Sequence, residues 1–112
     1  MLIPESEIRE VHGITPEQRK RIMDFLQGSV YSWCKNRKDE WFAARDLLGG
    51  DNFYWQHTPM YALYEKSDDV EQAGKDAGWL LKKVLDIDKR SFENKKEGLV
   101  RQYRWNGEEC NE

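Results

Sequence analysis

The sequence predicts a single, mainly helical α+β domain with three to four helices and a C-terminal β-hairpin. Three observations support this class. The chain has 112 residues, a length typical of one domain. Two long stretches carry apolar residues at three- and four-residue spacings behind good helix-capping residues. Residues 91–105 instead combine a polar turn with alternating apolar and polar side chains, which is typical of paired strands.

A long helix is expected from Thr15 to about Asn36. Thr15 can cap this helix, Pro16 suits its first turn, and Gln18 completes a capping box. Residues 1–14, ahead of the helix, are expected to be a polar lead-in. The apolar stripe of the helix consists of Ile22, Phe25, Leu26, Val30 and Trp33.

The middle of the chain is expected to hold short elements. Residues 40–42 suggest a very short strand. Residues 43–48 suggest a short helix, because Ala and Leu favour helix and Gly49 is a natural C-terminal stop. After an aromatic loop, a second Thr-Pro pair begins a helix over residues 58–66.

A longer helix is expected over residues 70–85. Asp69 can cap it, and Gln72 stands three residues further on, as in a capping box. Gly74 and Gly78 lie four residues apart and therefore share one face of this helix. Their small size predicts a close contact with another helix on that face.

The last part of the domain is expected to be the hairpin. Residues 91–93 form its first strand, residues 94–98 a polar turn, and residues 99–105 its second strand. The acidic residues 106–112 are expected to be a flexible tail. In the second strand Leu99, Tyr103 and Trp105 share one face, and Gln102 and Arg104 share the other.

This order of elements resembles that of a winged helix-turn-helix domain over residues 15–105. Two runs add to the resemblance: Ala-Ala-Arg-Asp-Leu-Leu-Gly, and Ala-Gly-Lys-Asp-Ala-Gly-Trp-Leu-Leu-Lys-Lys-Val-Leu. The resemblance implies that residues 70–85 occupy the recognition-helix position and that residues 91–105 form the wing. The stretch 49–68 departs from a minimal winged helix, because it is long and carries its own helical segment.

The charge distribution supports a contact with DNA. Residues 70–105 hold nine basic and six acidic side chains, whereas residues 1–69 hold nine basic and twelve acidic ones, and the net charge is −3. Positive charge on the last helix and hairpin predicts an accessory or regulatory protein, for example of a mobile element, that binds duplex DNA through its phosphates. The predicted contacts are Lys75, Lys82, Lys83, Lys95, Lys96, Arg101 and Arg104.

The aromatic segment 53–64 supports an alternative function. Exposed aromatic side chains are typical of protein interfaces. In this alternative the protein is a protein–protein interaction module that binds no nucleic acid, and it can self-associate as a homodimer. The predicted contacts are Phe53, Tyr54, Trp55, Tyr61 and Tyr64.

Other functions find little support in the sequence. The residues His12, His57, Cys34 and Cys110 are scattered singly, so no metal site or cofactor is expected. The chain has no Gly-rich phosphate loop, nucleophile elbow or His–carboxylate set, so no enzyme activity is expected. It also has no apolar run of signal-peptide or membrane-span length, which predicts a cytoplasmic protein without membrane contact.

Overall fold

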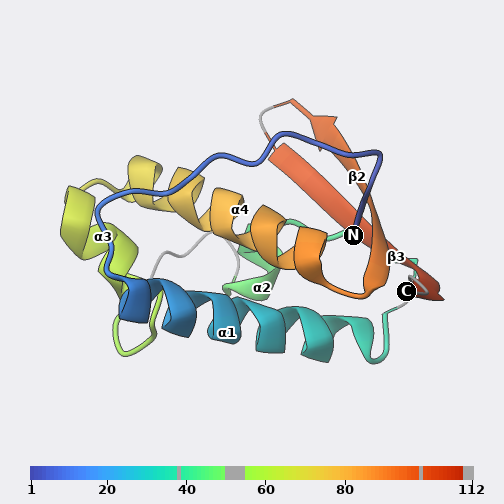
Figure 1. Cartoon of the computed structure of the whole chain (residues 1–112), viewed down its shortest axis with the longest axis horizontal. Helices are drawn as coiled ribbons and strands as arrows, with labels where there is room; N and C mark the ends of the chain where they lie inside the picture. Colours follow the sequence, from blue (N-terminus) through green and yellow to red (C-terminus); the bar gives the residue numbers. More distant parts are fainter. Residues whose placement is uncertain (38, 50–54, 99, 110–112) are drawn as a thin grey trace.

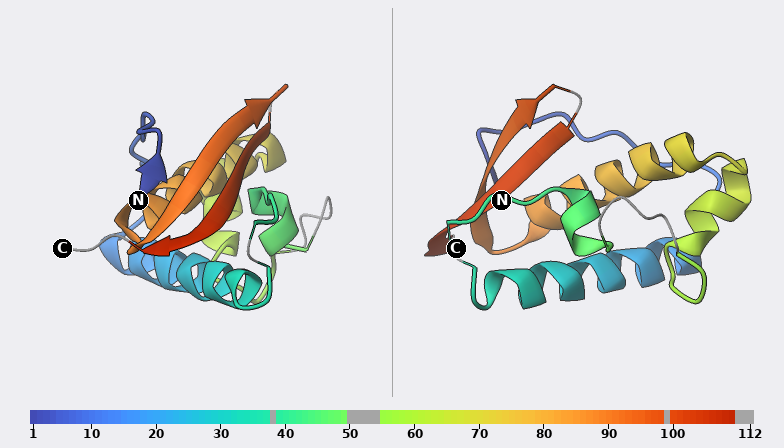
Figure 2. Two further views of the ribbon diagram at one scale, coloured as in Figure 1. Left: turned by 90° about the vertical axis from the view of Figure 1, so that its right-hand side faces the viewer. Right: turned by 180° about the vertical axis from the view of Figure 1, so that it is seen from behind.

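The fold is α+β, with four helices and one three-stranded sheet in the described part of the chain (Figure 1). The computed structural model describes residues 1–37, 39–49, 55–98 and 100–109. Helices α1 and α4 lie side by side, and the sheet lies beside the C-terminal part of α4 (Figures 1 and 2). The elements are β1 (Leu2–Ile3), α1 (Pro16–Cys34), α2 (Ala44–Leu47), α3 (Tyr61–Ser67), α4 (Val70–Ile87), β2 (Arg90–Glu97) and β3 (Val100–Glu109).

The two long helices begin where their capping residues predict. Thr15 Oγ1 accepts a hydrogen bond from the Gln18 backbone N–H at 3.0 Å, and Gln18 Oε1 accepts one from the Thr15 N–H at 2.9 Å. The carboxylate of Asp69 accepts a hydrogen bond from the backbone N–H of Glu71 at 2.9 Å. These bonds satisfy donors that a helix start otherwise leaves unpaired, and the local sequence is enough to form them.

The short middle elements differ in extent from the prediction. Phe42 makes a single antiparallel bridge to Tyr103, so residues 40–42 contribute one paired residue and not a strand. Helix α3 begins at Tyr61 and not at the Thr-Pro pair, because Thr58 Oγ1 accepts a hydrogen bond from the Met60 N–H at 3.2 Å within a turn ahead of the helix. The predicted short helix is present as α2.

The hairpin is longer than its sequence pattern indicates. Residues 94–97, expected in the turn, continue β2, and residues 106–109, expected in the tail, continue β3. The chain reverses at Gly98, whose φ of 59° lies in the left-handed region that glycine adopts without strain. Leu99 and residues 110–112 lie outside the described residues. The register pairs Phe92 with Trp105, Asn94 with Tyr103, Lys95 with Gln102, and Lys96 with Arg101.

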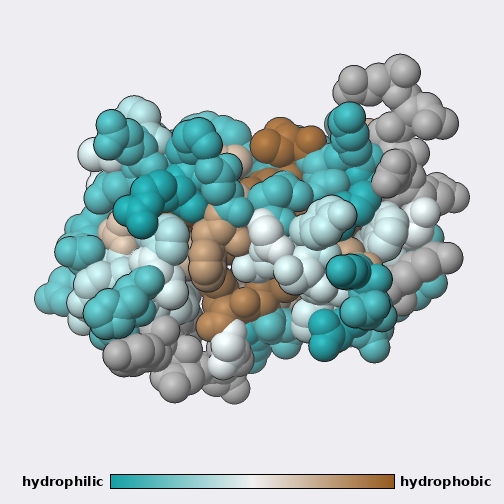
Figure 3. Space-filling model, turned by 90° about the horizontal axis from the view of Figure 1, so that it is seen from below, coloured by the Kyte–Doolittle hydropathy of each residue, from teal (hydrophilic) through white to brown (hydrophobic). Residues whose placement is uncertain are grey.

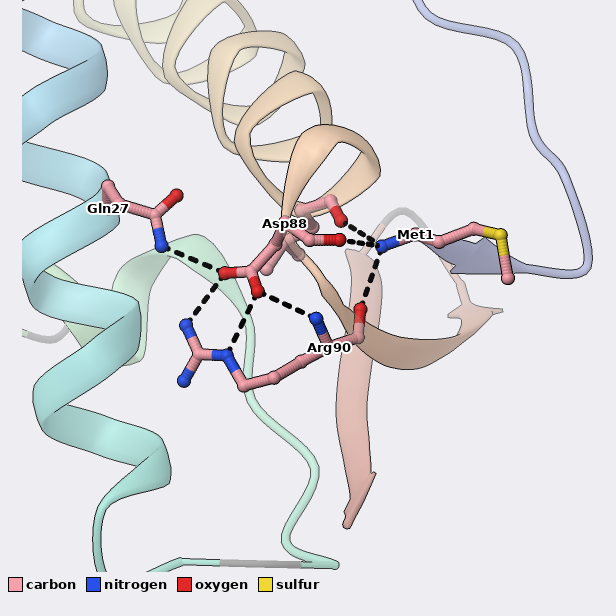
Figure 4. Close-up of polar contacts among 5 residues, drawn as sticks. Met1, Gln27, Asp88 and Arg90 are labelled. Carbon is pink, nitrogen blue, oxygen red and sulfur yellow. Dashed lines mark hydrogen bonds and ion pairs between the residues drawn. The ribbon is translucent and has the colours of Figure 1, made fainter. Parts of the chain in front are cut away.

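The N-terminal segment is part of the fold and not only a polar lead-in. Leu2 lies beside Phe92 in a parallel pairing of β1 with β2, and the side chain of Leu2 is buried. The α-amino group of Met1 donates hydrogen bonds to the backbone oxygens of Leu85, Asp88 and Arg90 at 2.8, 2.6 and 2.8 Å (Figure 4). The segment then crosses α4 on its way to α1 (Figure 1).

The core lies between α1, α4 and the sheet. The ring of Phe42 is central, because its centroid lies 5.6 Å from Trp33, 6.3 Å from Phe92 and 6.0 Å from Tyr103. These contacts hold the hairpin against the helices. The face of the hairpin that carries Phe92 and Tyr103 therefore lies next to α4 and α2. The largest fully buried side chains are Phe42, Phe92, Leu2, Ile22, Leu26, Met60, Leu63, Leu80, Leu81, Leu85, Val11 and Val30.

Candidate functional site

An open groove of about 730 Å³ lies between α4, α2 and the hairpin. Helix α2 and the N-terminal segment lie on opposite sides of α4 (Figure 2). One wall of the groove is α4, the other is the distal half of the hairpin, and α2 borders its end. The described lining residues are Ala43, Ala44, Arg45, Leu48, Trp55, Glu71, Gly74, Lys75, Ala77, Gly78, Trp79, Leu81, Lys82, Lys96, Val100, Arg101 and Tyr103.

Cationic side chains from three elements meet at this groove. Lys75 and Lys82 come from α4, Lys96 and Arg101 from the hairpin, and Arg45 from α2. Among the described lining residues the only carboxylate is that of Glu71, on the wall formed by α4. The groove therefore carries a strong excess of positive charge, although the whole chain is slightly acidic.

Local geometry explains why these side chains share the groove. Lys75, Gly78 and Lys82 follow one another at spacings of three and four residues, so they lie on one face of α4. Lys96 and Arg101 are direct partners across the two strands, so both point to the same face of the hairpin. Arg45 is not among the contacts predicted from sequence, because only the docking of α2 brings this residue to the groove and no local pattern indicates it.

Lys82 is the most deeply placed of these cations. It is 5% exposed and lines the groove, and its ammonium group lies over the ring of Trp79, 5.1 Å from the centroid, in place of an ion pair with a described carboxylate. Burial lowers the pKa of Lys82, and the positive charge of Arg101 lowers it further, while Glu7 acts in the opposite direction. Because a buried charge is stable only with compensation, an anion in the groove would stabilise the charged form of Lys82.

The other groove cations lie nearer to solvent. The Arg101 Nη1 donates to Asn94 Oδ1 at 2.9 Å, a neutral partner that fixes the guanidinium and leaves its charge uncompensated. Lys75 Nζ lies 3.8 Å from the exposed carboxylate of Glu71, a pair that solvent screens. The side chain of Lys96 is exposed on the hairpin.

Three of the predicted DNA contacts do not lie in the groove. Lys83 lies 3.4 Å from the Glu10 carboxylate of the N-terminal segment. Lys95 and Arg104 occupy the other face of the hairpin, where both stack on the ring of Trp41 at 4.3 and 4.7 Å from its centroid. They also form ion pairs, Lys95 with Glu97 at 3.3 Å and Arg104 with Glu93 at 2.6 Å. The alternation of strand side chains separates these residues from Lys96 and Arg101.

The glycine face of α4 borders the groove. Gly74 and Gly78 both line the groove. A methyl group built at Gly78 would have no neighbouring atom within 4 Å. The expected close helix contact at Gly78 is therefore wrong, and its missing side chain instead leaves the floor of the groove open.

The aromatic segment is divided between core and surface. Trp55 is 4% exposed and belongs to the core, so its side chain is not available as the centre of a binding surface. Tyr61 and Tyr64 are half-buried, with ring centroids 5.8 Å apart. Phe53 and Tyr54 lie outside the described residues. The surface predicted for self-association is thereby reduced, among the described residues, to two tyrosines.

A second surface feature lies on the α1 side of the molecule. Seen from below, this side shows a hydrophobic band across its middle (Figure 3). Two open hollows lie along α1, one lined in part by Phe25 and Leu47, the other by Met23, Val84 and Ile87. Both hollows also include acidic and basic residues, so this surface has no preference for a charged ligand.

Comparison with protein-family models, with curated proteins and with solved structures returned no match for this chain. Within the described ranges no three His, Cys, Asp or Glu side chains gather closely enough to hold a metal ion. No helix among the described residues has the length and apolarity needed to cross a membrane. The groove is thus the candidate functional site with the most distinctive chemistry, a set of converging cations around an apolar floor.

Proposed function

We propose that this protein binds duplex DNA through the groove between α4, α2 and the hairpin. The cations on the walls bind the phosphates of one DNA backbone, which forms a ridge on the duplex surface. The activity is binding without catalysis, as expected of an accessory or regulatory protein. The winged-helix interpretation belongs to this proposal and is supported by the order of elements and by the bridge between Phe42 and Tyr103.

One observation carries the proposal. Five cations from three separate elements line one groove, with Glu71 as the only carboxylate among its described residues. Four of these five cations belong to the set predicted from sequence as phosphate contacts. Convergence of positive charge on one site favours a polyanion, because each phosphate neutralised releases counterions from the DNA.

The packing of α4 indicates how the DNA is contacted. This helix contacts α1, α2, α3 and β2, and eight of its residues are buried. Little of its surface is free to enter a major groove and read base edges. The groove cations instead address phosphates, so we expect affinity with little dependence on base sequence.

The test is duplex binding measured as a function of salt. We expect the affinity for a mixed-sequence duplex of about 20 base pairs to fall with a log–log slope of about −4.5, if each of the five cations neutralises one phosphate. In the triple variant Lys75→Gln, Lys96→Gln and Arg101→Gln the slope should shrink to about −2. All three side chains reach solvent, so the variant should fold.

The chain offers a matched control. The triple variant Lys83→Gln, Lys95→Gln and Arg104→Gln removes the same charge from predicted contacts that lie outside the groove. It should keep the wild-type slope. Equal losses in the two triple variants, or no duplex binding at low salt, would overturn the proposal. Absence of DNA binding together with a concentration-dependent dimer would favour the interaction-module alternative.

A further inference from the structure

The groove has an apolar floor beside its cations. Half-buried apolar and aromatic residues line much of the groove and form this floor, among them Ala44, Leu48, Gly78 and Trp79. A volume of about 730 Å³ is in the range of sites that enclose a small organic ligand. A sugar–phosphate ridge is polar and charged, and it would leave this apolar surface without a partner.

One recessed cation, Lys82, and the half-buried Arg101 lie beside this floor. Lys82 is almost fully buried, and Arg101, whose charge lowers the pKa of Lys82, is oriented by its bond to Asn94. The more exposed Lys75 and Lys96 stand further out. Lys82 is therefore the deepest cation and Arg101 is intermediate, and an anionic group that enters the groove can reach both of them.

From this juxtaposition of an apolar floor with Lys82 and Arg101 we propose that the groove accommodates one unpaired nucleotide, with its base on the floor and its phosphate at these two cations. This inference rests on the proposed DNA-binding function and names the part of the nucleic acid that the site recognises. Bases offer flat, weakly polar faces, and their burial against apolar or aromatic side chains is tolerant of sequence. In paired DNA the bases are stacked inside the duplex, so only an unpaired nucleotide can reach the floor.

An open position on α4 makes the floor testable. Gly78 lines the groove, and a side chain added there would extend into open space. The variant Gly78→Leu should therefore fill part of the floor, and it removes none of the cations. Gly28 on α1 is a matched control, because it is also helical and has no atom within 4 Å of an added methyl group, but it lies in the hollow beside Phe25.

The experiment compares a single strand of ten thymidine nucleotides with a blunt duplex, using fluorescence anisotropy at low salt. We expect Gly78→Leu to weaken the single strand at least tenfold, on the order of the loss of one stacked base, and to weaken the duplex several-fold less, because the duplex has no stacked base to lose there. Gly28→Leu should change neither affinity. Far-UV circular dichroism verifies that both variants are folded.

The outcomes separate this inference from the proposed function. Duplex binding without single-strand binding, or single-strand binding that Gly78→Leu leaves unchanged, overturns the unpaired-nucleotide site and keeps the duplex function. Equal weakening of both DNAs by Gly78→Leu also overturns it, because the floor would then receive the backbone. If neither DNA binds, both proposals fall.

Two further probes identify the source of the ligand. Binding of free thymidine monophosphate that Gly78→Leu abolishes supports a site for a free nucleotide, whereas binding of the strand alone supports a site for single-stranded DNA. A ten-residue polyglutamate peptide provides a test for a protein ligand. If this peptide binds as tightly as the single strand and with the same sensitivity to Gly78→Leu, the groove recognises an acidic peptide and the inference is wrong.

Discussion

Replacement of Asp88 by Asn should strongly destabilise the protein. The Asp88 carboxylate accepts hydrogen bonds from Gln27 Nε2 at 2.8 Å, from the Arg90 backbone N–H at 2.9 Å, and from Arg90 Nε and Nη2 at 3.0 and 2.7 Å (Figure 4). The side chains of Asp88 and Arg90 are only 6% and 10% exposed. The pair joins α1, the end of α4 and the start of β2.

The structure sets the size of the effect. Removal of one partner of a buried ion pair costs about 3–5 kcal/mol, because the other charge is left buried without compensation. Arg90 also lies over the rings of Tyr31, Phe92 and Trp105, at 5.5, 5.5 and 5.8 Å from their centroids. These rings would still stabilise part of the Arg90 charge after the Asp88 carboxylate is removed. We therefore expect the lower end, about 3 kcal/mol, out of a total of roughly 5–15 kcal/mol.

Urea unfolding followed by circular dichroism measures this loss. With a denaturant slope of about 1.5 kcal/mol/M, the midpoint at pH 7 should fall by about 2 M. The matched control is Glu93→Gln, which removes the carboxylate of the Arg104 pair, whose side chains are 35% and 32% exposed. Because solvent screens that pair, its loss should cost less than about 1 kcal/mol.

The pH dependence gives a second measurement. Burial alone would raise the pKa of Asp88, but the hydrogen bonds from Arg90 and Gln27 outweigh it, so the pKa is lowered. A carboxyl group with a lowered pKa stabilises the folded state above about pH 4, and this contribution disappears as the pH falls through the folded-state pKa. In Asp88→Asn the free energy of unfolding should therefore fall less on acidification than it does in the wild type. The reasoning is refuted if the free energy of unfolding of the variant lies within 1 kcal/mol of that of the wild type. It is also refuted if the two proteins lose stability equally as the pH falls.

Three further changes have defined outcomes. Acetylation of the Met1 amino group, which removes a charged donor to three backbone oxygens, should cost about 2 kcal/mol, and an unchanged Tm would contradict this role. Gly78→Ala should raise the unfolding free energy by about 0.5–1 kcal/mol, because alanine favours helix and meets no atom there; a lower urea midpoint would show that the position is not open. Trp55→Ala should cost about 3–5 kcal/mol by leaving a core cavity, and an unaltered urea midpoint would indicate that Trp55 is a surface residue.

Local patterns were sufficient for the helices and for the faces of the hairpin. The Thr15–Gln18 capping box and the Asp69 cap form as predicted, because each involves residues within one turn. Tyr103 and Gln102 lie on opposite faces of β3, as alternation predicts. The extent of the hairpin was underestimated, since polar residues such as Asn94 and Lys95 do not indicate a strand on their own and are held by their cross-strand partners.

The candidate site was only partly predictable. The α4 pair Lys75 and Lys82 could be assigned to one face by helical spacing, and the same argument places Lys83 about 100° away. Strand alternation alone is likewise enough to separate Lys95 from Lys96, because neighbouring residues of a strand point to opposite faces. No local signal indicates that Arg45 joins them, because its position depends on how α2 docks.

By itself, the sequence determined where the long helices begin, which side chains share a face, and that positive charge collects on α4 and the hairpin. Only the tertiary structure decided which of those charges meet at the groove. It also decided that Leu2 pairs with Phe92 of β2 and that Trp55 is buried. The physical reason is the range of the interactions. Caps and periodicities act within a few residues, whereas the groove is made by packing elements that are far apart in the chain around a shared core.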